Sequence, residues 1–462
     1  MGSPALGVLL PGFEGATLPG WLRERLADGL AGVCLFATNI VSPAQLRELT
    51  AAIRDANPQA VVAVDEEGGD VTRLHQRTGS PYPGNAILGR LDDVELTRRV
   101  GETVGRELAA AGITLDFAPD ADINSDDRNP VIGTRSFGAD PRLVSRHTVA
   151  WIAGLQSTGV AASAKHFPGH GDTSSDSHLA MPVVDLPLEA LRRRELLPFA
   201  AAIGAGTRSV MTSHILLPQL DAQNVATFSP LILGELLRGE LGFTGAIVTD
   251  ALDMRGASGG IGMAAAAVRA LAAGADLLCL GTASTAEQVD ELAEAIGARV
   301  PASRIADARE RVAPLGALPP AAASPAPAPA FDLDRTVGAF DVADGVVVRR
   351  ARVLVQLETG SNIAVGESPW GPAAAGAGVV HVREGDPLPS SGEAQLVVVG
   401  RDNHRRAWTR DAIGAARASG ADVLVIDMGW PSADRRYADV ATFGASAHTG
   451  AALLRLLGSL AG

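Results

Sequence analysis

Cysteine is scarce in this sequence, which contains only Cys34 and Cys279 among 462 residues. Each lies within an apolar run, GVCLF or DLLCLG, so we expect two buried thiols rather than a disulfide or a ligand pair. The N-terminal stretch MGSPALGVLLPGFEG lacks the basic leader and small-residue cleavage site of a secretory signal. Together these absences predict a protein of the reducing cytoplasm.

Long apolar runs and an excess of positive charge are also missing. No stretch reaches the roughly 18 uninterrupted apolar residues of a membrane span, so no membrane partner is expected. The 39 basic residues are outnumbered by 52 acidic ones, which gives a net charge of −13. Such a chain repels polyanions and has no basic run interleaved with aromatic residues, so nucleic acid is not an expected partner.

The length of the chain predicts two or three domains, and one boundary is clear. The stretch PLGALPPAAASPAPAPA, residues 314–330, is rich in proline and alanine and has no hydrophobic period. This composition is typical of an extended, semi-rigid spacer. We therefore predict a catalytic domain at residues 1–313, a linker at 314–330 and a smaller domain at 331–462.

The region before the linker repeats one pattern: a short apolar run, a loop bearing glycine or aspartate, and an amphipathic stretch. The amphipathic stretch 42–56, for example, has Ser42 as N-cap and Pro43 in its first turn. Nearly continuous apolar runs indicate strands that are buried on both faces. Eight strand–helix units predict an α/β fold of the (β/α)8 TIM-barrel type, with a doubly wound open sheet as the alternative. The runs are 7–10, 32–36, 61–65, 113–119, 160–165, 209–214, 246–250 and 276–281.

The region after the linker starts a second alternation of apolar runs and helical patterns. The runs lie at 350–358, 379–384, 394–402 and 421–429, and a helical pattern covers 409–420. This alternation predicts a small α/β domain with a mostly parallel sheet, of the α/β/α sandwich kind. Its loops carry no phosphate-binding fingerprint, so the pattern predicts a fold but no function.

Charged or imidazole groups occur where the predicted barrel strands end. In a parallel barrel these ends meet at one face, which carries the active site in enzymes of this architecture. We interpret the convergence as a functional rim rather than as independent, solvated loop residues. The residues in question are Asp65, Asp120, Lys165, His166, His214 and Asp250.

One stretch, KHFPGHGDTSSDSH at residues 165–178, raises three possibilities. His166 and His170 are spaced like zinc ligands, but that spacing needs a helix, and Pro168 and Gly169 lie between them. Zinc binding by these two histidines would therefore require a non-helical geometry. A phosphate cradle usually has its lysine after the glycines, whereas Lys165 precedes them. We therefore expect neither a metal nor a cofactor.

The third possibility is proton transfer by Asp176 and His178. Residues two apart in an extended segment point to the same side, so the carboxylate can fix the tautomer of the imidazole. An ordinary loop pair is an equal alternative on these residues alone. Asp250 follows an apolar strand and should project into the barrel mouth, whereas Asp253 suits the first turn of a helix. A carboxylate facing an acid/base is the minimum for a retaining glycoside hydrolase, although other chemistry stays open.

Five motifs in order resemble glycoside hydrolase family 3, and specifically its bacterial β-N-acetylglucosaminidase branch. They are VDEEGGDVTRL (64–74), FAPDADINSDDRNPVIGTRSFGADP (117–141), KHFPGHGDTSSDSH (165–178), VMTSHI (210–215) and IVTDALDM (247–254). The resemblance implies that Asp250 is the nucleophile and that His178 is the acid/base, paired with Asp176. It further implies a set of sugar-binding residues, whose donors and acceptors suit a neutral polyol: Asp65, Arg73, Arg135, Lys165, His166 and His214.

The sequence departs from the family pattern in two places. Asp70 stands where an arginine is common, and the second domain is short, with faint motifs. In other branches of the family the second domain supplies the acid/base, so Glu393 or Asp402 could in principle act as the acid/base here. The intact DSH at 176–178 makes that unnecessary.

The resemblance implies a cofactor-free, retaining exo-β-N-acetylglucosaminidase that acts through a glycosyl-aspartate. Its substrates would be terminal β-linked N-acetylglucosamine residues of muropeptides or chitooligosaccharides. One alternative is a phosphorylase, because a neutral histidine does not repel phosphate. A substrate-assisted mechanism is disfavoured, since Asp250–Ala251 lacks the adjacent acidic pair that it usually needs. A catalytically silent sugar-binding barrel would predict the loss of a member of the catalytic set, yet Asp250, Asp176 and His178 are all present.

Overall fold

The computed structural model describes residues 2–173, 182–317, 331–362 and 364–461. Most of the predicted linker, at 318–330, and the predicted dyad of Asp176 and His178 lie outside these residues. The described chain divides into two compact units. Unit 1 comprises the described residues within Met1–Glu66, Val94–Ile123 and Ala139–Ala328, and unit 2 those within Glu67–Asp93, Asn124–Gly138 and Pro329–Gly462.

Unit 1 is a closed parallel barrel. Six strands pair in the order β2-β3-β4-β5-β6-β9, and β1 pairs with β10. The bridge between Val248 and Leu277 joins β9 to β10, and the Cys34 amide donates to the Pro11 carbonyl (3.0 Å) to join β2 to β1. The predicted (β/α)8 barrel is confirmed, and each of its strands overlaps a predicted apolar run; β7 (Leu216–Leu217) and β8 (Asp221–Val225) form a separate antiparallel pair. The strands are β1 (Leu9–Leu10), β2 (Gly32–Leu35), β3 (Val61–Val64), β4 (Leu115–Asp116), β5 (Ala161–Phe167), β6 (Ser209–Thr212), β9 (Ala246–Val248) and β10 (Leu278–Cys279).

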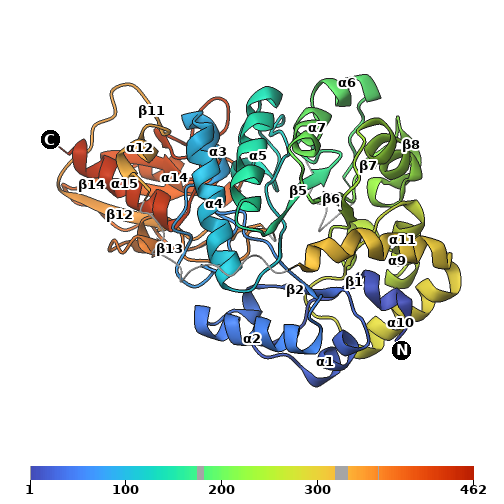
Figure 1. Ribbon diagram of the computed structural model, residues 1–462. Coiled ribbons are helices and arrows are strands. Elements are labelled where there is room, and N and C mark those ends of the chain that lie inside the picture. The colour runs from blue at the N-terminus through green and yellow to red at the C-terminus, as the bar shows by residue number, and fades with distance from the viewer. Residues whose placement is uncertain (1, 174–181, 318–330, 363, 462) are drawn as a thin grey trace. The chain divides into compact units, whose positions relative to one another are not determined.

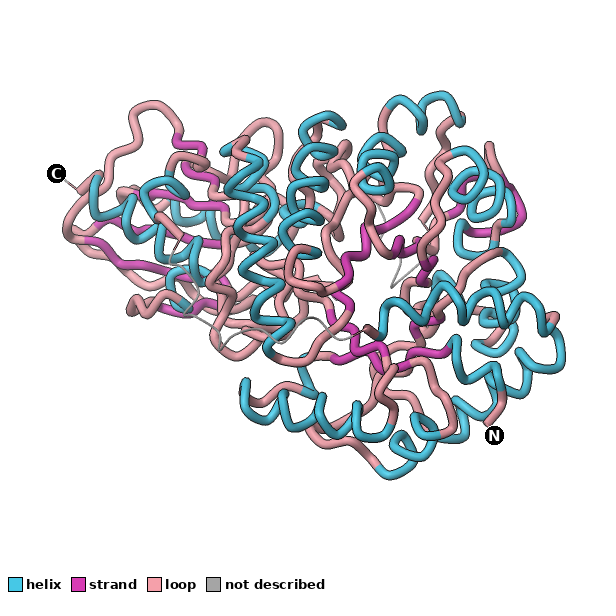
Figure 2. The backbone as a smooth tube through the Cα atoms, in the orientation of Figure 1, coloured by secondary structure: helices cyan, strands magenta, loops and turns pink. Residues whose placement is uncertain are grey.

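Helices surround this ring of strands (Figure 2). The helix α2 (Pro43–Ala56) begins as predicted, because the Ser42 hydroxyl accepts from the Gln45 amide at 3.2 Å. Both cysteines are buried and neither forms a disulfide, as expected. The other helices are α1 (Gly20–Ala27), α4 (Val94–Ala110), α5 (Pro141–Gln156), α6 (Leu188–Arg193), α7 (Leu196–Gly204), η5 (Leu231–Glu240), α8 (Arg255–Ser258), α9 (Met263–Ala273), α10 (Ala286–Arg299) and α11 (Ala302–Val312) (Figure 1).

Unit 2 contains a six-stranded sheet in the order β11-β16-β15-β14-β12-β13. Every pair is parallel except that of β11 with β16. Successive residues of β14 point to opposite faces: Val397 packs in one apolar cluster with Leu453 of α15, and Val398 in another with Ile413 of α14. The predicted α/β sandwich is confirmed. Its elements are β11 (Asp341–Val342), β12 (Arg352–Leu357), β13 (Val380–Val382), β14 (Gln395–Gly400), β15 (Val423–Asp427), β16 (Val440–Ala441), α12 (Leu333–Val337), α13 (Gly371–Ala374), α14 (Ala407–Ala418) and α15 (Ala447–Ser459).

Two earlier segments, residues 67–93 and 124–138, also belong to unit 2. The first includes helix α3 (Asn85–Leu91). The Asp70 carboxylate accepts from the Ala445 amide at 2.7 Å and from the Thr134 hydroxyl at 2.9 Å. The Arg405 guanidinium donates to three backbone carbonyls within residues 127–129. These units are defined by packing and not by independent folding, so the domain division expected at 314–330 stays a prediction.

None of the helices in the described ranges combines the length and the apolar character that are needed to cross a bilayer.

Candidate active site

The barrel brings most of the predicted rim residues to the carboxyl ends of neighbouring strands. Asp65 follows β3, Lys165 and His166 lie in β5, and His214 and Asp250 follow β6 and β9. The strands β3, β4, β5, β6 and β9 are adjacent in this order. Parallel neighbours place these ends at one face, which gathers carboxylates, an ammonium and two imidazoles there.

Lys165 and Asp65 form a largely buried ion pair. The Lys165 Nζ lies 2.7 Å from Asp65 Oδ1, and the two side chains are 2% and 20% exposed. Asp116 of β4 is fully buried beside them, and burial raises its pKa well above the usual range of a carboxyl. Sequence reasoning missed Asp116, although it is the one charged residue in the run ITLDFAP. Burial thus favours the neutral form of the Asp116 carboxyl near this ion pair.

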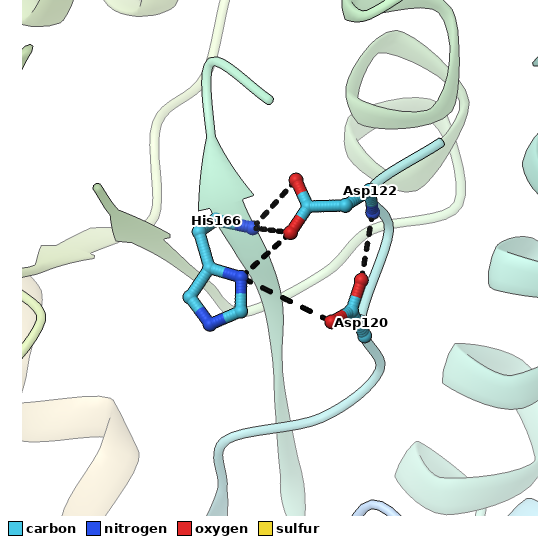
Figure 3. A group of neighbouring side chains, drawn as sticks. All are labelled: Asp120, Asp122 and His166. Atoms are coloured by element: carbon cyan, nitrogen blue, oxygen red, sulfur yellow. Dashed lines mark hydrogen bonds and ion pairs between the residues drawn. The ribbon is translucent and has the colours of Figure 1, made fainter. Parts of the chain in front are cut away.

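His166 is oriented by Asp122, a residue that sequence reasoning did not single out. Its Nδ1 lies 2.7 Å from Asp122 Oδ2, and its backbone amide donates to the same carboxylate at 3.3 Å (Figure 3). Asp122 also accepts from the His170 amide at 2.7 Å, while its own amide donates to Asp120 at 2.9 Å. A histidine held by a carboxylate at Nδ1 presents Nε2 on the opposite side of the ring.

Asp120, Asp122 and His166 could also supply three metal ligands, since their ligand atoms lie within 4.8 Å of one another. The carboxylate of Asp122, however, already accepts N–H groups from His166 and His170. Such donors stabilise a buried carboxylate without a cation. Burial lowers the pKa of His170 to about 4, so its ring is neutral at pH 7. The arrangement therefore favours a hydrogen-bonded histidine–aspartate pair.

Asp250 is half-buried, and its Oδ1 accepts from the Ala251 amide at 2.8 Å. His214 is fully buried; its Nδ1 lies 2.9 Å from Thr227 Oγ1 and its Nε2 lies 3.1 Å from the Ala251 carbonyl oxygen. Both residues thus meet at Ala251, which the sequence did not single out.

The described residues 169–173 contact Arg194 and Glu195, which immediately precede α7. Arg194 Nη2 lies 2.6 Å from Asp172 Oδ2, and Arg194 Nε lies 2.5 Å from Glu195 Oε1. Gly169 has a φ of +127°, and an added Cβ would lie 2.8 Å from the Cβ of Glu195. Glycine at 169 is therefore required by close packing of the loop on Glu195.

The Glu195 carboxyl should make the stability of the folded protein depend on pH. Burial raises its pKa from 4.5 to about 7, against the opposing charge of Arg194. The folded state thus binds this proton more tightly than the unfolded state, so the stabilisation is complete below pH 4.5 and is lost as the pH rises through 7. The increase in the Glu195 pKa corresponds to a contribution on the order of 3 kcal/mol to the free energy of unfolding.

As the pH is raised from 5 to 8, we expect the urea concentration at the unfolding midpoint of the wild type to decrease. The midpoint of E195Q should decrease less, because glutamine does not titrate. Parallel unfolding curves across this range measure the difference. An equal decrease in the urea midpoint for the wild type and E195Q would contradict the prediction.

The two remaining predicted sugar-binding residues, Arg73 and Arg135, lie in unit 2. Arg135 makes a bidentate pair with Glu67, with Nε–Oε2 at 2.9 Å and Nη2–Oε1 at 2.7 Å, and both side chains are at most 4% exposed. Arg73 donates to the carbonyls of Ala364 (2.7 Å) and Val365 (3.2 Å). Sequence reasoning missed Glu67, although it lies in the first family motif.

Comparison with known proteins decides the family. Residues 22–315 match the model of the glycosyl hydrolase family 3 N terminal domain. This chain belongs to glycosyl hydrolase family 3. As a family 3 member it is a glycoside hydrolase that acts on carbohydrate.

This family 3 chain is similar to proteins named β-hexosaminidase. It is 43% identical over 258 residues to that of Pseudomonas aeruginosa strain LESB58, across 55% of this chain and 76% of that protein. It is 38% identical over 284 residues to β-hexosaminidase A of Pseudoalteromonas piscicida, across 56% of this chain; the chain spans only about half (47%) of that relative. Among solved structures, a family 3 β-N-acetylglucosaminidase from Paenibacillus sp. FPU-7 is 30% identical, with a TM-score of 0.88 over 100% of this chain and 97% of that one.

Proposed function

We propose that this family 3 member is a retaining exo-β-N-acetylglucosaminidase that releases terminal β-linked N-acetylglucosamine from muropeptides or chitooligosaccharides. The observation that carries the proposal is Asp250, whose carboxylate stands after β9 on the rim that also holds Lys165 and His166. The likeness to β-hexosaminidases supports the choice of sugar. We also place the protein in the cytoplasm, in keeping with its two buried cysteines.

In the first step, Asp250 attacks the anomeric carbon, and the bond to the aglycone oxygen breaks. Protonated His178, oriented by Asp176, gives its proton to that oxygen. In the second step, neutral His178 takes a proton from water as the water attacks the glycosyl-aspartate, which releases the sugar and regenerates Asp250. Among the described residues, Asp172 lies four positions before Asp176 in the chain, and its carboxylate is bound by Arg194.

We further propose that residues on the rim of unit 1 bind the sugar. The pair of Lys165 and Asp65 offers a donor beside an acceptor, which suits adjacent hydroxyl groups. His166 would present Nε2, because Asp122 holds Nδ1. The family resemblance also implies sugar binding by Arg73 and Arg135, whose guanidinium groups are hydrogen-bond donors.

Phosphorolysis is the second candidate, favoured by a histidine at 178 in place of a carboxylate acid/base. A neutral imidazole adds no negative charge, so phosphate is not repelled from the glycosyl-enzyme as it would be by a glutamate. The product would then be a sugar 1-phosphate.

A panel of aryl β-glycosides, each assayed with and without inorganic phosphate, tests the proposal. We expect turnover of the N-acetylglucosaminide, free N-acetylglucosamine as the product by NMR, and a rate that phosphate does not raise. Phosphate-dependent turnover with a 1-phosphate product would establish the second candidate. Failure to cleave any aryl β-N-acetylglucosaminide would refute the proposed activity and revive the sugar-binding alternative.

A further inference from the structure

His214 and Asp250 follow adjacent strands of the barrel. β6 ends at Thr212 and β9 ends at Val248, and the two strands pair in parallel from Ser209 to Met211. The chain segments that leave these strands therefore emerge side by side. His214 lies in the first of these segments and Asp250 in the second.

The two side chains meet through the backbone of one residue, Ala251. Its amide donates to Asp250 Oδ1 at 2.8 Å. Its carbonyl oxygen accepts from the Met254 amide at 3.2 Å and lies 3.1 Å from His214 Nε2. Because a carbonyl oxygen can only accept, Nε2 must carry a proton and donate it. One backbone residue is thus bonded to the Asp250 carboxylate on one side and to the imidazole on the other.

The other side of the His214 ring is held by hydroxyl groups. Nδ1 lies 2.9 Å from Thr227 Oγ1, and the same hydroxyl lies 2.9 Å from the Ser213 carbonyl and 2.8 Å from Thr212 Oγ1. All four residues are 0% exposed. In such surroundings, water cannot replace a lost contact, so the ring has a single favourable orientation.

We propose that His214 is a positioning residue for Asp250, which acts through the Ala251 backbone and does not touch the sugar. This differs from the direct sugar contact that the family resemblance implies, and it rests on the proposed nucleophilic role of Asp250. A nucleophile must be held close to its attacking geometry, and a displacement of about 1 Å can cost on the order of 100-fold in rate. His214 prevents the turn at 250–251 from shifting by that amount.

Three substitutions at one position separate positioning from sugar binding. H214L removes both ring nitrogens but keeps a bulky apolar group. H214Q can return a donor near the place of Nε2, and H214N can return one only near the place of Nδ1. The measurements are the saturating rate of covalent labelling at Asp250 by a 5-fluoro N-acetylglucosaminyl fluoride and the dissociation constant of N-acetylglucosamine.

We expect H214L to slow labelling by about 10- to 100-fold with an unchanged dissociation constant, and H214Q to recover part of the rate while H214N does not. Weaker sugar binding in H214L, with labelling at the wild-type saturating rate, would overturn the proposal. If H214L does not fold, the pair of H214Q and H214N decides: equal labelling rates would refute positioning through Ala251.

The same measurements on the wild-type protein distinguish a failure of this inference from a failure of the proposed function. Wild-type protein that cleaves no β-N-acetylglucosaminide would refute the function, and labelling at a residue other than Asp250 would refute the nucleophile. Wild-type protein labelled at Asp250, together with a fully active H214L, would refute only the role of His214.

Discussion

D250N is expected to lower kcat for aryl β-N-acetylglucosaminide hydrolysis by on the order of 10⁴-fold or more, because no covalent intermediate can form without the carboxylate. The Ala251 amide would still meet an oxygen at this position, so the turn itself should be preserved. Steady-state kinetics on a 2,4-dinitrophenyl glycoside measures the loss, and the far-UV spectrum and the urea midpoint report whether the fold is intact.

The matched control is D253N, which makes the same change three residues later on an exposed side chain and should stay near wild-type activity. Azide adds a stereochemical readout. With D250A, azide replaces the missing nucleophile and should give the α-glycosyl azide; with H178A, it intercepts the glycosyl-enzyme and should give the β-anomer. A D250N protein with substantial turnover, or identical azide products from the two variants, would contradict these roles.

R135M is expected to lower the free energy of unfolding by about 3–5 kcal/mol, because it leaves the buried Glu67 carboxylate without its bidentate partner. Urea unfolding at pH 7 measures the effect. R128M is the matched control in the same segment: Arg128 is 77% exposed and pairs with Asp126 at the surface, where solvent screens the pair and its loss should change the stability little. Equal losses in the two variants would contradict the prediction.

The double variant E67M/R135M separates the stability of this pair from its part in sugar binding. With both charges removed, most of the stability should return, since no uncompensated charge stays buried. If Arg135 holds the sugar, kcat/KM stays low in this stable protein. Recovery of kcat/KM together with stability would limit Arg135 to a structural role.

The barrel and the α/β sandwich were predictable because the sequence patterns that indicate their strands and helices are local. Strands buried on both faces are nearly all apolar, and a run such as 61–65 ends where the polar rim begins. Ser42 and Pro43 likewise mark the start of α2 through contacts within one turn of helix. The identity of the rim residues follows from the same strand ends.

The pairings within the site were not predictable, because they join residues far apart in the chain. Lys165 meets Asp65 across 100 positions, and Arg135 meets Glu67 across 68. Such contacts depend on strand order and register, which spacing does not specify. His166 shows the same limit: the sequence draws attention to His170 four residues later, whereas the carboxylate that orients its ring is Asp122, 44 positions earlier.

The contact between Asp70 and Ala445 spans 375 positions, and it has a consequence for synthesis. A chain emerging from the ribosome can close the barrel strands once residue 279 has been made. The segments 67–93 and 124–138 contact each other, but they also contact residues that are made much later, such as Asn362, Arg405 and Ala445. A nascent chain can therefore form its barrel strands before the segments that carry Arg73 and Arg135 have all of their packing partners.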